Sequence, residues 1–237
     1  MNDDRKTRRR RRRGRSRLAL ARALLWSLGR LSLPAAQRLG RLLGRIFWIR
    51  NGKTHGIVEE NLARCLPELD AEARGKLARR TLIETGMGLI ETAPVWNWHR
   101  PQLEAVVQEM DGFEAIEAAI EEGRGAILLA PHIGNWELGG LATAARTPTT
   151  VMYRPPREPA LESLLNDVRS RFGSDMAPAN LRGVRQALRA LKRGELVAIL
   201  PDQAPRAGEG VLAPFFDHPA LTMTLIRTLS RRTGAPA

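Results

Sequence analysis

Short apolar runs alternate with amphipathic helical segments through the second half of the chain, after Pro101. An apolar run of about four to eight residues suits a buried strand, and a longer amphipathic stretch suits a helix that covers a sheet. We therefore expect an α/β fold in which a mixed sheet is flanked by helices. The expected strands are 126–130, 150–153, 196–200 and 211–215, and the expected helices are 112–121, 135–145, 159–172, 183–192 and 222–232.

The segment before this alternation is expected to be helical. Between residues 51 and 98 the apolar side chains keep helical spacing, with a break expected between Pro67 and Asp70. A chain of 237 residues, 43% of them hydrophobic, can bury one sizeable core. We assign residues 51–237 to one α/β domain whose first part, 51–98, is helical.

Positive charge is concentrated at the N-terminus. Residues 1–17 contain ten Arg or Lys against Asp3 and Asp4, within a formal net charge of +13 for the whole chain. Such a segment repels itself and has nothing apolar to bury, so it cannot fold alone. We expect residues 1–17 to form a disordered Arg-rich tail that interacts with an anionic partner.

Two amphipathic helices are expected in residues 18–50. The first covers 18–31, with leucines on one side and Arg22 and Arg30 on the other, and Pro34 is expected to end it. The second sets an apolar face against a basic one. Its apolar residues are Leu39, Leu42, Leu43, Ile46 and Phe47, and its basic residues are Arg38, Arg41 and Arg45.

These helices allow two interpretations. They can be ordinary helices packed on the domain, or they can attach the chain to an anionic membrane surface. The Arg-rich tail favours the second, because each basic residue near an anionic leaflet contributes about 1 kcal/mol. No uninterrupted apolar run of about 18 residues occurs, so a clean transmembrane helix is not expected.

A histidine followed five positions later by a glutamate occurs three times in the chain. The pairs are His55/Glu60, His99/Glu104 and His132/Glu137. With 25 acidic residues and four histidines among 237 residues, chance pairs are expected, so the spacing alone identifies no site.

The surroundings of the three histidines separate them. His132 follows the expected strand 126–130 and precedes Gly134–Asn135, which can start a helix. Open α/β sheets place their sites there, beyond the carboxyl ends of the strands. His55 lies in a helical segment, where this spacing turns the two side chains about 140° apart. His99 precedes an Arg-Pro joint that forms no cleft.

A neutral imidazole at His132 would suit a general base. Glu137 would then accept a hydrogen bond from the other ring nitrogen and fix the tautomer. No Gly-x-Ser-x-Gly sequence occurs, so the nucleophile is expected to be a hydroxyl of an acceptor substrate. Its attack on an acyl group would form an oxyanion that backbone N–H groups or an arginine could stabilise. The alternative is a buried histidine satisfied by a neighbouring acid.

Metal and cofactor chemistry have little support in the sequence. The histidines are scattered, Cys65 is the only cysteine, and no Walker or Rossmann glycine pattern occurs. We expect no metal and no cofactor. A single cysteine also suits a reducing cytoplasm.

Several motifs, in order along the chain, resemble those of the bacterial lipid A biosynthesis (lauroyl/myristoyl) acyltransferases, within the wider His-x4-Asp/Glu glycerolipid acyltransferase group. The resemblance runs from about residue 20 to the last residue. Asp217 departs from it, since the family commonly has glycine there, and family members continue past Ala237, so the chain looks truncated at its C-terminus. The motifs are His132-Ile-Gly-Asn-Trp-Glu-Leu, Val151-Met-Tyr-Arg-Pro, Arg169-Ser-Arg171, Leu200-Pro-Asp-Gln203, Pro214-Phe-Phe, Ala220-Leu-Thr and Arg231-Arg-Thr-Gly-Ala-Pro.

The resemblance implies roles for individual residues. His132 is implied as the general base and Glu137 as its orienting partner. Without the resemblance, Arg169 and Arg171 would be read as the solvated end of a helix, and Asp202 as a residue that initiates a turn. The residues implied in substrate binding are Asn135, Arg154, Arg169, Arg171 and Asp202.

The resemblance also implies an activity. It is the transfer of a fatty acyl chain from an acyl carrier protein thioester to a hydroxyl of a lipid A precursor, at the cytoplasmic face of the bacterial inner membrane. A basic surface would suit an acidic carrier protein, and arginines suit phosphate and carboxylate groups. The alternatives are a lysophospholipid or other glycolipid acceptor and, in another class, the nucleic-acid-binding module that a pI near 11.3 suggests. Nucleic-acid binding would fall steeply with salt and survive any change at His132.

Overall fold

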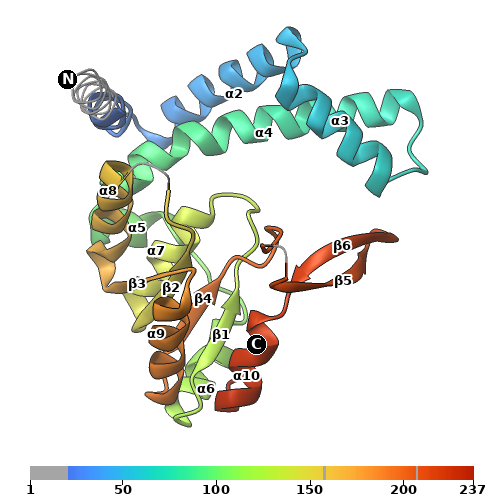
Figure 1. Ribbon diagram of the computed structural model, residues 1–237. Coiled ribbons are helices and arrows are strands. Elements are labelled where there is room, and N and C mark those ends of the chain that lie inside the picture. The colour runs from blue at the N-terminus through green and yellow to red at the C-terminus, as the bar shows by residue number, and fades with distance from the viewer. Residues whose placement is uncertain (1–20, 157–158, 207) are drawn as a thin grey trace, which may run out of the picture.

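The computed structural model describes residues 21–156, 159–206 and 208–237. Four of its strands form one sheet in the order β1-β4-β2-β3, and every neighbouring pair in that sheet is parallel. The expected α/β class is confirmed. The sheet itself is parallel rather than mixed, because β5 pairs with β6 in a separate antiparallel hairpin (Figure 1). The strands are β1 (Ala126–Leu129), β2 (Thr149–Tyr153), β3 (Ser174–Pro178), β4 (Leu196–Ile199), β5 (Gly210–Phe215) and β6 (His218–Met223).

The expected helices of this region are present, with ends displaced by a few residues. Three elements were not expected: α5, β3 and β6. Their sequences explain this, because α5 is only seven residues long, β3 lacks β-branched residues and β6 contains Pro219. The helices are α5 (Arg100–Val106), α6 (Phe113–Glu121), α7 (Trp136–Arg146), α8 (Pro159–Arg169), α9 (Leu181–Lys192) and α10 (Leu225–Thr233), with a 3₁₀ turn, η1 (Ser170–Phe172), after α8.

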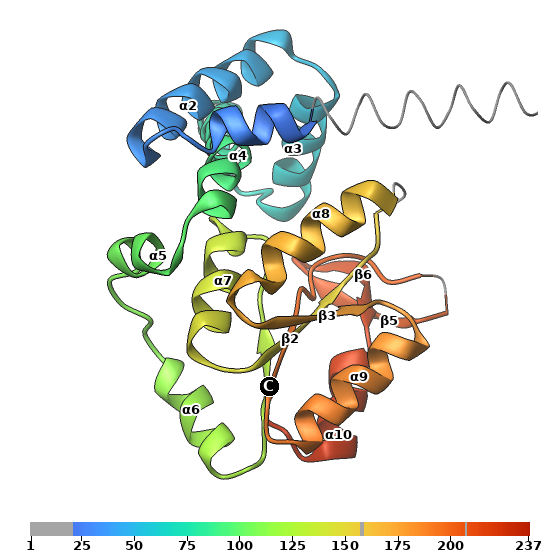
Figure 2. The same cartoon turned by 90° about the vertical axis from the view of Figure 1, so that its left-hand side faces the viewer.

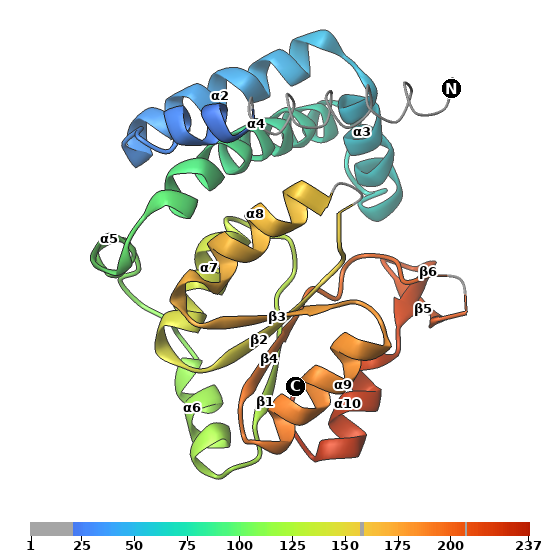
Figure 3. The same ribbon diagram turned by 60° about the vertical axis from the view of Figure 1, so that its left-hand side comes forward.

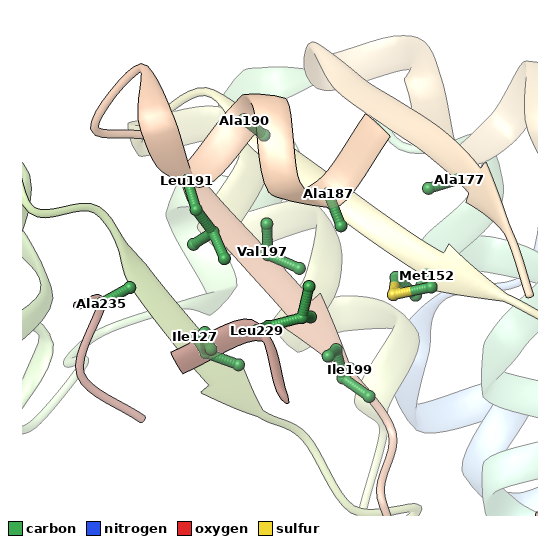
Figure 4. Packing of buried hydrophobic residues seen from close by; sticks show 10 residues of the cluster. All are labelled: Ile127, Met152, Ala177, Ala187, Ala190, Leu191, Val197, Ile199, Leu229 and Ala235. Atoms are coloured by element: carbon green, nitrogen blue, oxygen red, sulfur yellow. The ribbon is translucent and has the colours of Figure 1, made fainter. Parts of the chain in front are cut away.

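Helices cover both faces of the parallel sheet, because neighbouring residues of a strand point to opposite sides. On one face, Ile127 and Val197 pack against α9 and α10 (Figure 4). On the other, Ala126 and Leu196 pack against Ala119 of α6. Burial on both faces explains why β1 and β4 are continuous apolar runs.

Two helices of the N-terminal region lie side by side above the sheet domain (Figures 1 and 2). They are α2 (Leu33–Arg50) and α4 (Ala71–Asn97), and α3 (Lys53–Cys65) connects them. The expected break between Pro67 and Asp70 is confirmed by the gap between α3 and α4. Pro34 does not end a helix, because it lies in the first turn of α2, where its missing N–H is harmless. The helix before it covers residues 21–28 of the described part.

The buried face of α2 is made of small residues. Ala36, Gly40 and Gly44 are buried against α4, where a Cβ added at Gly44 would collide with the backbone of Leu82 and Ile83. Only part of the leucine face identified from the sequence points away from α4, since Leu43 and Phe47 are half-buried. Its exposed members, extended by one residue, are Leu39, Leu42, Ile46 and Ile49, which are 39–77% exposed.

The tail expected at residues 1–17 lies outside the described residues. Within residues 21–156, 159–206 and 208–237, no helix has both the length and the apolar character needed to cross a bilayer.

Candidate active site

His132 and Asp202 meet beyond the carboxyl ends of two neighbouring parallel strands. Leu129 ends β1 and Ile199 ends β4, and these two residues are paired in the sheet. His132 and Asp202 are each the third residue past those ends, so the register brings them together. The His132 backbone N–H donates to Oδ2 of Asp202 at 2.7 Å, and its ring Nδ1 lies 2.8 Å from Oδ1.

The environment of Asp202 favours its ionised form. Burial raises the pKa of this carboxyl, but the hydrogen bonds from the backbone and ring of His132, with the charge of the ring, outweigh burial and leave the pKa below its usual value. A carboxylate accepting from Nδ1–H leaves Nε2 as the unprotonated nitrogen.

Glu137 has a different partner from the one expected. Its carboxylate, 7% exposed, accepts two hydrogen bonds from Arg169, from Nε at 3.1 Å and from Nη2 at 2.5 Å. Among the described residues it accepts none from His132. The expected hydrogen bond between Glu137 and the His132 ring is therefore replaced by one from the ring to Asp202. The start of α7 aims Glu137 at the end of α8, where Arg169 lies.

The other ring nitrogen of His132 faces a large cleft. The cleft has a volume of about 1220 Å³, and both His132 and Gln203 line it. The Gln203 side-chain nitrogen lies 3.4 Å from Nε2, and the Trp136 ring stands edge-on to the imidazole with centroids 4.9 Å apart. Pockets for ordinary small molecules measure roughly 300–1,000 Å³, so this cleft has room for a larger substrate.

The structure brings together most of the residues implied in substrate binding. Arg154, which follows β2, and Arg169 both line the cleft. Asn135 lines it too, but its side chain caps α7 by accepting from the Leu138 N–H at 3.1 Å. Asp202 does not line the cleft, because it stands behind the His132 ring.

Arg171 is separate from the other candidates. Its guanidinium donates to the backbone oxygens of Trp96 and Trp98 at 2.7 and 3.4 Å, at the carboxyl end of α4. Helix ends leave such carbonyls without partners, so this contact stabilises the end of α4. Arg171 is not among the residues that line the cleft.

Two of the polar residues that line the cleft had no assigned role in the sequence and make informative contacts. Gln203 is the first, and its position directly after Asp202 was the only signal. Tyr153 is the second: its hydroxyl donates to Glu162 at 2.7 Å, and burial together with that hydrogen bond raises the pKa of Tyr153. Nothing in the local sequence pairs Tyr153 with Glu162, because they belong to different elements.

The other histidines with the same glutamate spacing lie in different settings. His55 stacks on Trp48 with ring centroids 4.4 Å apart, and its contact is with Glu59 at 3.6 Å rather than Glu60. His99 is exposed and immediately precedes α5, at its N-cap position. Within the described residues, no group of three or more His, Cys, Asp or Glu side chains is arranged to hold a metal ion.

Comparison with known proteins gives one consistent family. The family model described as "Bacterial lipid A biosynthesis acyltransferase" matches residues 6–237. The lipid A biosynthesis lauroyltransferase of Escherichia coli K12 is 31% identical over 216 residues, which is 90% of this chain and 69% of the relative. The lipid A biosynthesis palmitoleoyltransferase of the same strain is 29% identical over 213 residues, with the same coverage. A phosphatidylinositol mannoside acyltransferase of Mycobacterium tuberculosis is 28% identical over 81% of this chain and 62% of the relative.

Proposed function

The chain belongs to the bacterial lipid A biosynthesis acyltransferase family, and on this premise we propose that its cleft transfers a fatty acyl chain from a thioester donor to a hydroxyl of a lipid A precursor. The observation that supports this most directly is the setting of His132. Its ring is held by a carboxylate on one side and open to a large cleft on the other.

His132 acts as the general base through Nε2. It accepts the proton of the acceptor hydroxyl as that oxygen attacks the thioester carbonyl. Asp202 orients the ring through Nδ1 and stabilises the imidazolium that forms. Collapse of the tetrahedral intermediate forms the ester and breaks the carbon–sulfur bond, and the leaving thiolate takes the proton back from Nε2. Asp202 thus has the role that the sequence assigned to Glu137.

Donors near Nε2 stabilise the oxyanion of the intermediate. The Gln203 amide lies at this nitrogen, and the N–H groups of the first turn of α7 follow the His132 loop. Glu137 contributes by holding Arg169 in place, since it accepts two hydrogen bonds from the guanidinium. Glu137 is in this scheme a positioning residue.

Arginines of the cleft bind the anionic groups of the substrates. Arg154 and Arg169 line the cleft, and guanidinium groups bind phosphate and carboxylate bidentately. A lipid A precursor carries anions of this kind. The donor is an acyl carrier protein, whose acidic surface suits a basic enzyme with a net charge of +13.

Residues 18–50 attach the enzyme to the cytoplasmic face of the bacterial inner membrane. The exposed part of the leucine face of α2 supports this, because arginines flank an apolar stripe in which Leu39, Leu42, Ile46 and Ile49 are 39–77% exposed. Ordinary packing on the domain would bury that stripe. The Arg-rich tail at residues 1–17 adds electrostatic attraction to anionic lipids.

A transfer assay tests the reaction. The protein is incubated with a lipid A precursor and with acyl carrier protein loaded with chains of several lengths, and the products are measured by mass spectrometry. Transfer is expected with the wild type and is expected to be lost in His132→Ala, which should still fold and unfold in one cooperative thermal transition. Transfer by His132→Ala at the wild-type rate, or none by the wild type from any donor to any acceptor, would refute the proposal.

A second acceptor class has one specific observation in its favour. The mycobacterial relative that is 28% identical to this chain is named for phosphatidylinositol mannoside, a different glycolipid. The same assay decides between the acceptors when a lysophospholipid and a mannosylated glycolipid are supplied in place of the lipid A precursor. Preferential transfer to either would assign that acceptor instead.

A further inference from the structure

A basic face runs along α9. Arg182, Arg185, Arg189 and Lys192 are all exposed, and their positions fall within an arc of about 80° at 100° per residue. The opposite side of the helix carries the small and apolar residues that pack on the sheet, Ala187 and Leu191 among them. Burial of that side forces the basic face outward.

The neighbouring helix α10 enlarges the basic surface. It packs beside α9, and its Arg227 and Arg231, one turn apart, are also exposed (Figure 3). In the described part of the chain, none of these six side chains is within ion-pair distance of an acidic group. Arg193, at the end of α9, is bound by Glu195 and so differs from them. We use the name α9–α10 basic surface for the side chains of Arg182, Arg185, Arg189, Lys192, Arg227 and Arg231.

This surface begins at the edge of the cleft. Leu181 and Val184 of α9 line the cleft, and so do Leu225 and Thr228 of α10. The first basic residues of the surface are therefore sequence neighbours of cleft residues. From there, the surface runs along α9 from Arg182 to Lys192, a distance of about 15 Å at 1.5 Å per residue. A macromolecule docked on it would be placed beside the cleft entrance.

The surface and the leucine face of α2 lie at opposite ends of the molecule. Figures 1, 2 and 3 are turned about one vertical axis, and in all three α2 stays at the top while α9 and α10 stay in the lower half. If α2 contacts the bilayer, the α9–α10 basic surface faces the aqueous side. The partner that it fits is then a soluble acidic protein rather than a lipid headgroup.

We propose that the α9–α10 basic surface is the docking site for the acidic acyl carrier protein that delivers the acyl thioester to the cleft. This inference rests on the proposed acyl transfer from a carrier-protein donor. Complementary charge holds the carrier on the surface, and a tethered thioester arm reaches past Leu181 into the cleft.

The test compares charge reversals at two places. Arg185→Glu/Arg189→Glu changes the α9–α10 basic surface, and Arg79→Glu/Arg80→Glu makes the same charge change at two exposed arginines of α4. The affinity for acyl carrier protein is measured by titration at low and high salt. Steady-state transfer is measured with acyl-loaded acyl carrier protein and with the same acyl group attached to pantetheine. Circular dichroism confirms folding, and the milder Arg185→Gln/Arg189→Gln is a second variant if the reversal does not fold.

The α9 reversal is expected to weaken carrier binding and to raise the KM for acyl carrier protein by at least about tenfold, since rim charges act chiefly on association. In the α9 variant, the transfer rate with acyl-pantetheine should be unchanged. The α4 control should bind and use acyl carrier protein as the wild type does. Unchanged carrier binding in the α9 variants would overturn the docking site, and so would loss of binding to anionic vesicles or nucleic acid with carrier binding kept. Wild-type protein that transfers from no donor would refute the proposed function instead.

Discussion

Of the two carboxylates given roles beside His132, Asp202 and Glu137, only Asp202 contacts the imidazole ring in the described part of the chain. Asp202 accepts hydrogen bonds from both the backbone and the ring of His132, while Glu137 accepts from Arg169. A negative charge on the Nδ1 side strengthens the base at Nε2. The chemistry at this residue scale should therefore depend on the charge of Asp202 more directly than on that of Glu137.

Replacing Asp202 with asparagine tests this dependence. Asp202→Asn keeps the size of the side chain but removes its charge and the preferred tautomer of the ring. By comparison with the loss of the orienting carboxylate in a serine-protease triad, kcat should fall by about 10³- to 10⁴-fold, with a smaller change in KM. Steady-state transfer kinetics measure both.

The matched control is the same amide substitution at the other carboxylate. In Glu137→Gln, the low-field proton resonance of a His132 Nδ1–H bound to a carboxylate should persist, whereas in Asp202→Asn it should be absent. Proton NMR of the two variants gives this result independently of activity. A resonance that persists in Asp202→Asn and is absent in Glu137→Gln would instead assign the orienting role to Glu137.

The lowered pKa of Asp202 also predicts a pH dependence of stability. The folded protein binds this proton less tightly than the unfolded chain, so the ionised carboxylate stabilises the fold above its ordinary pKa of 3.8. That contribution is lost as the pH falls through the lowered value. The difference in unfolding free energy between wild type and Asp202→Asn should shrink below pH 3.8 in urea titrations. It should stay below about 1 kcal/mol, because the group is partly exposed. A difference that grows in acid would contradict the prediction.

The sequence distinguished His132 from the other histidines but did not identify its partner. The apolar run before His132 and the helix start after it are local features, and they can be recognised in one stretch of chain. The partner depends on strand order, because Asp202 reaches His132 only through the pairing of β4 with β1. The two residues are 70 positions apart in the sequence, and no local pattern carries that information.

At the scale of elements, the contact between α2 and α4 depends on glycines. Gly40 and Gly44 of α2 face Gly86 of α4, and a Cβ at any of the three would meet the backbone of the other helix. Such close approach lets the two backbones pack without large side chains between them. The leucines of α2 are consequently free to face outward.

Two alanine substitutions on α4 measure this contact. Gly86→Ala should destabilise the protein by about 1–3 kcal/mol, because the added methyl has no room. Gly88→Ala, two residues further along the same helix, meets open space and should be neutral or stabilising by up to about 1 kcal/mol. Chemical denaturation gives both values, and equal effects at the two positions would refute the close packing.

The helical wheel of residues 38–47 predicted an amphipathic helix, and α2 confirms the helix. It did not reveal which face is buried. Apolar spacing normally marks the buried face, but in α2 the buried residues are the small ones between the leucines and arginines. In a sequence, glycines within a helix indicate low helix propensity. They form a packing surface here only because Gly86 of α4 lies against them.

At the scale of the whole molecule, the proposals assign different surroundings to its two ends. The leucine face of α2 would enter the bilayer interface, and the α9–α10 basic surface would face the carrier protein in water (Figure 1). The α9–α10 basic surface begins at the edge of the cleft and α2 lies at the other end of the molecule, so lipid acceptor and soluble donor would approach from different sides. This orientation can be tested without any transfer reaction.

Two equally exposed aliphatic residues, one on each of these helices, make the matched pair: Ile49 of α2 and Leu181 of α9, both 77% exposed. Burial of such a side chain contributes about 1.5–3 kcal/mol, so Ile49→Asp should lower partitioning into anionic phospholipid vesicles by about tenfold or more. Leu181→Asp should leave partitioning unchanged, as measured by vesicle co-sedimentation at constant salt. If Leu181→Asp weakened vesicle binding as much as Ile49→Asp, α9 would lie at the membrane, and both the orientation and the carrier docking site would fail together.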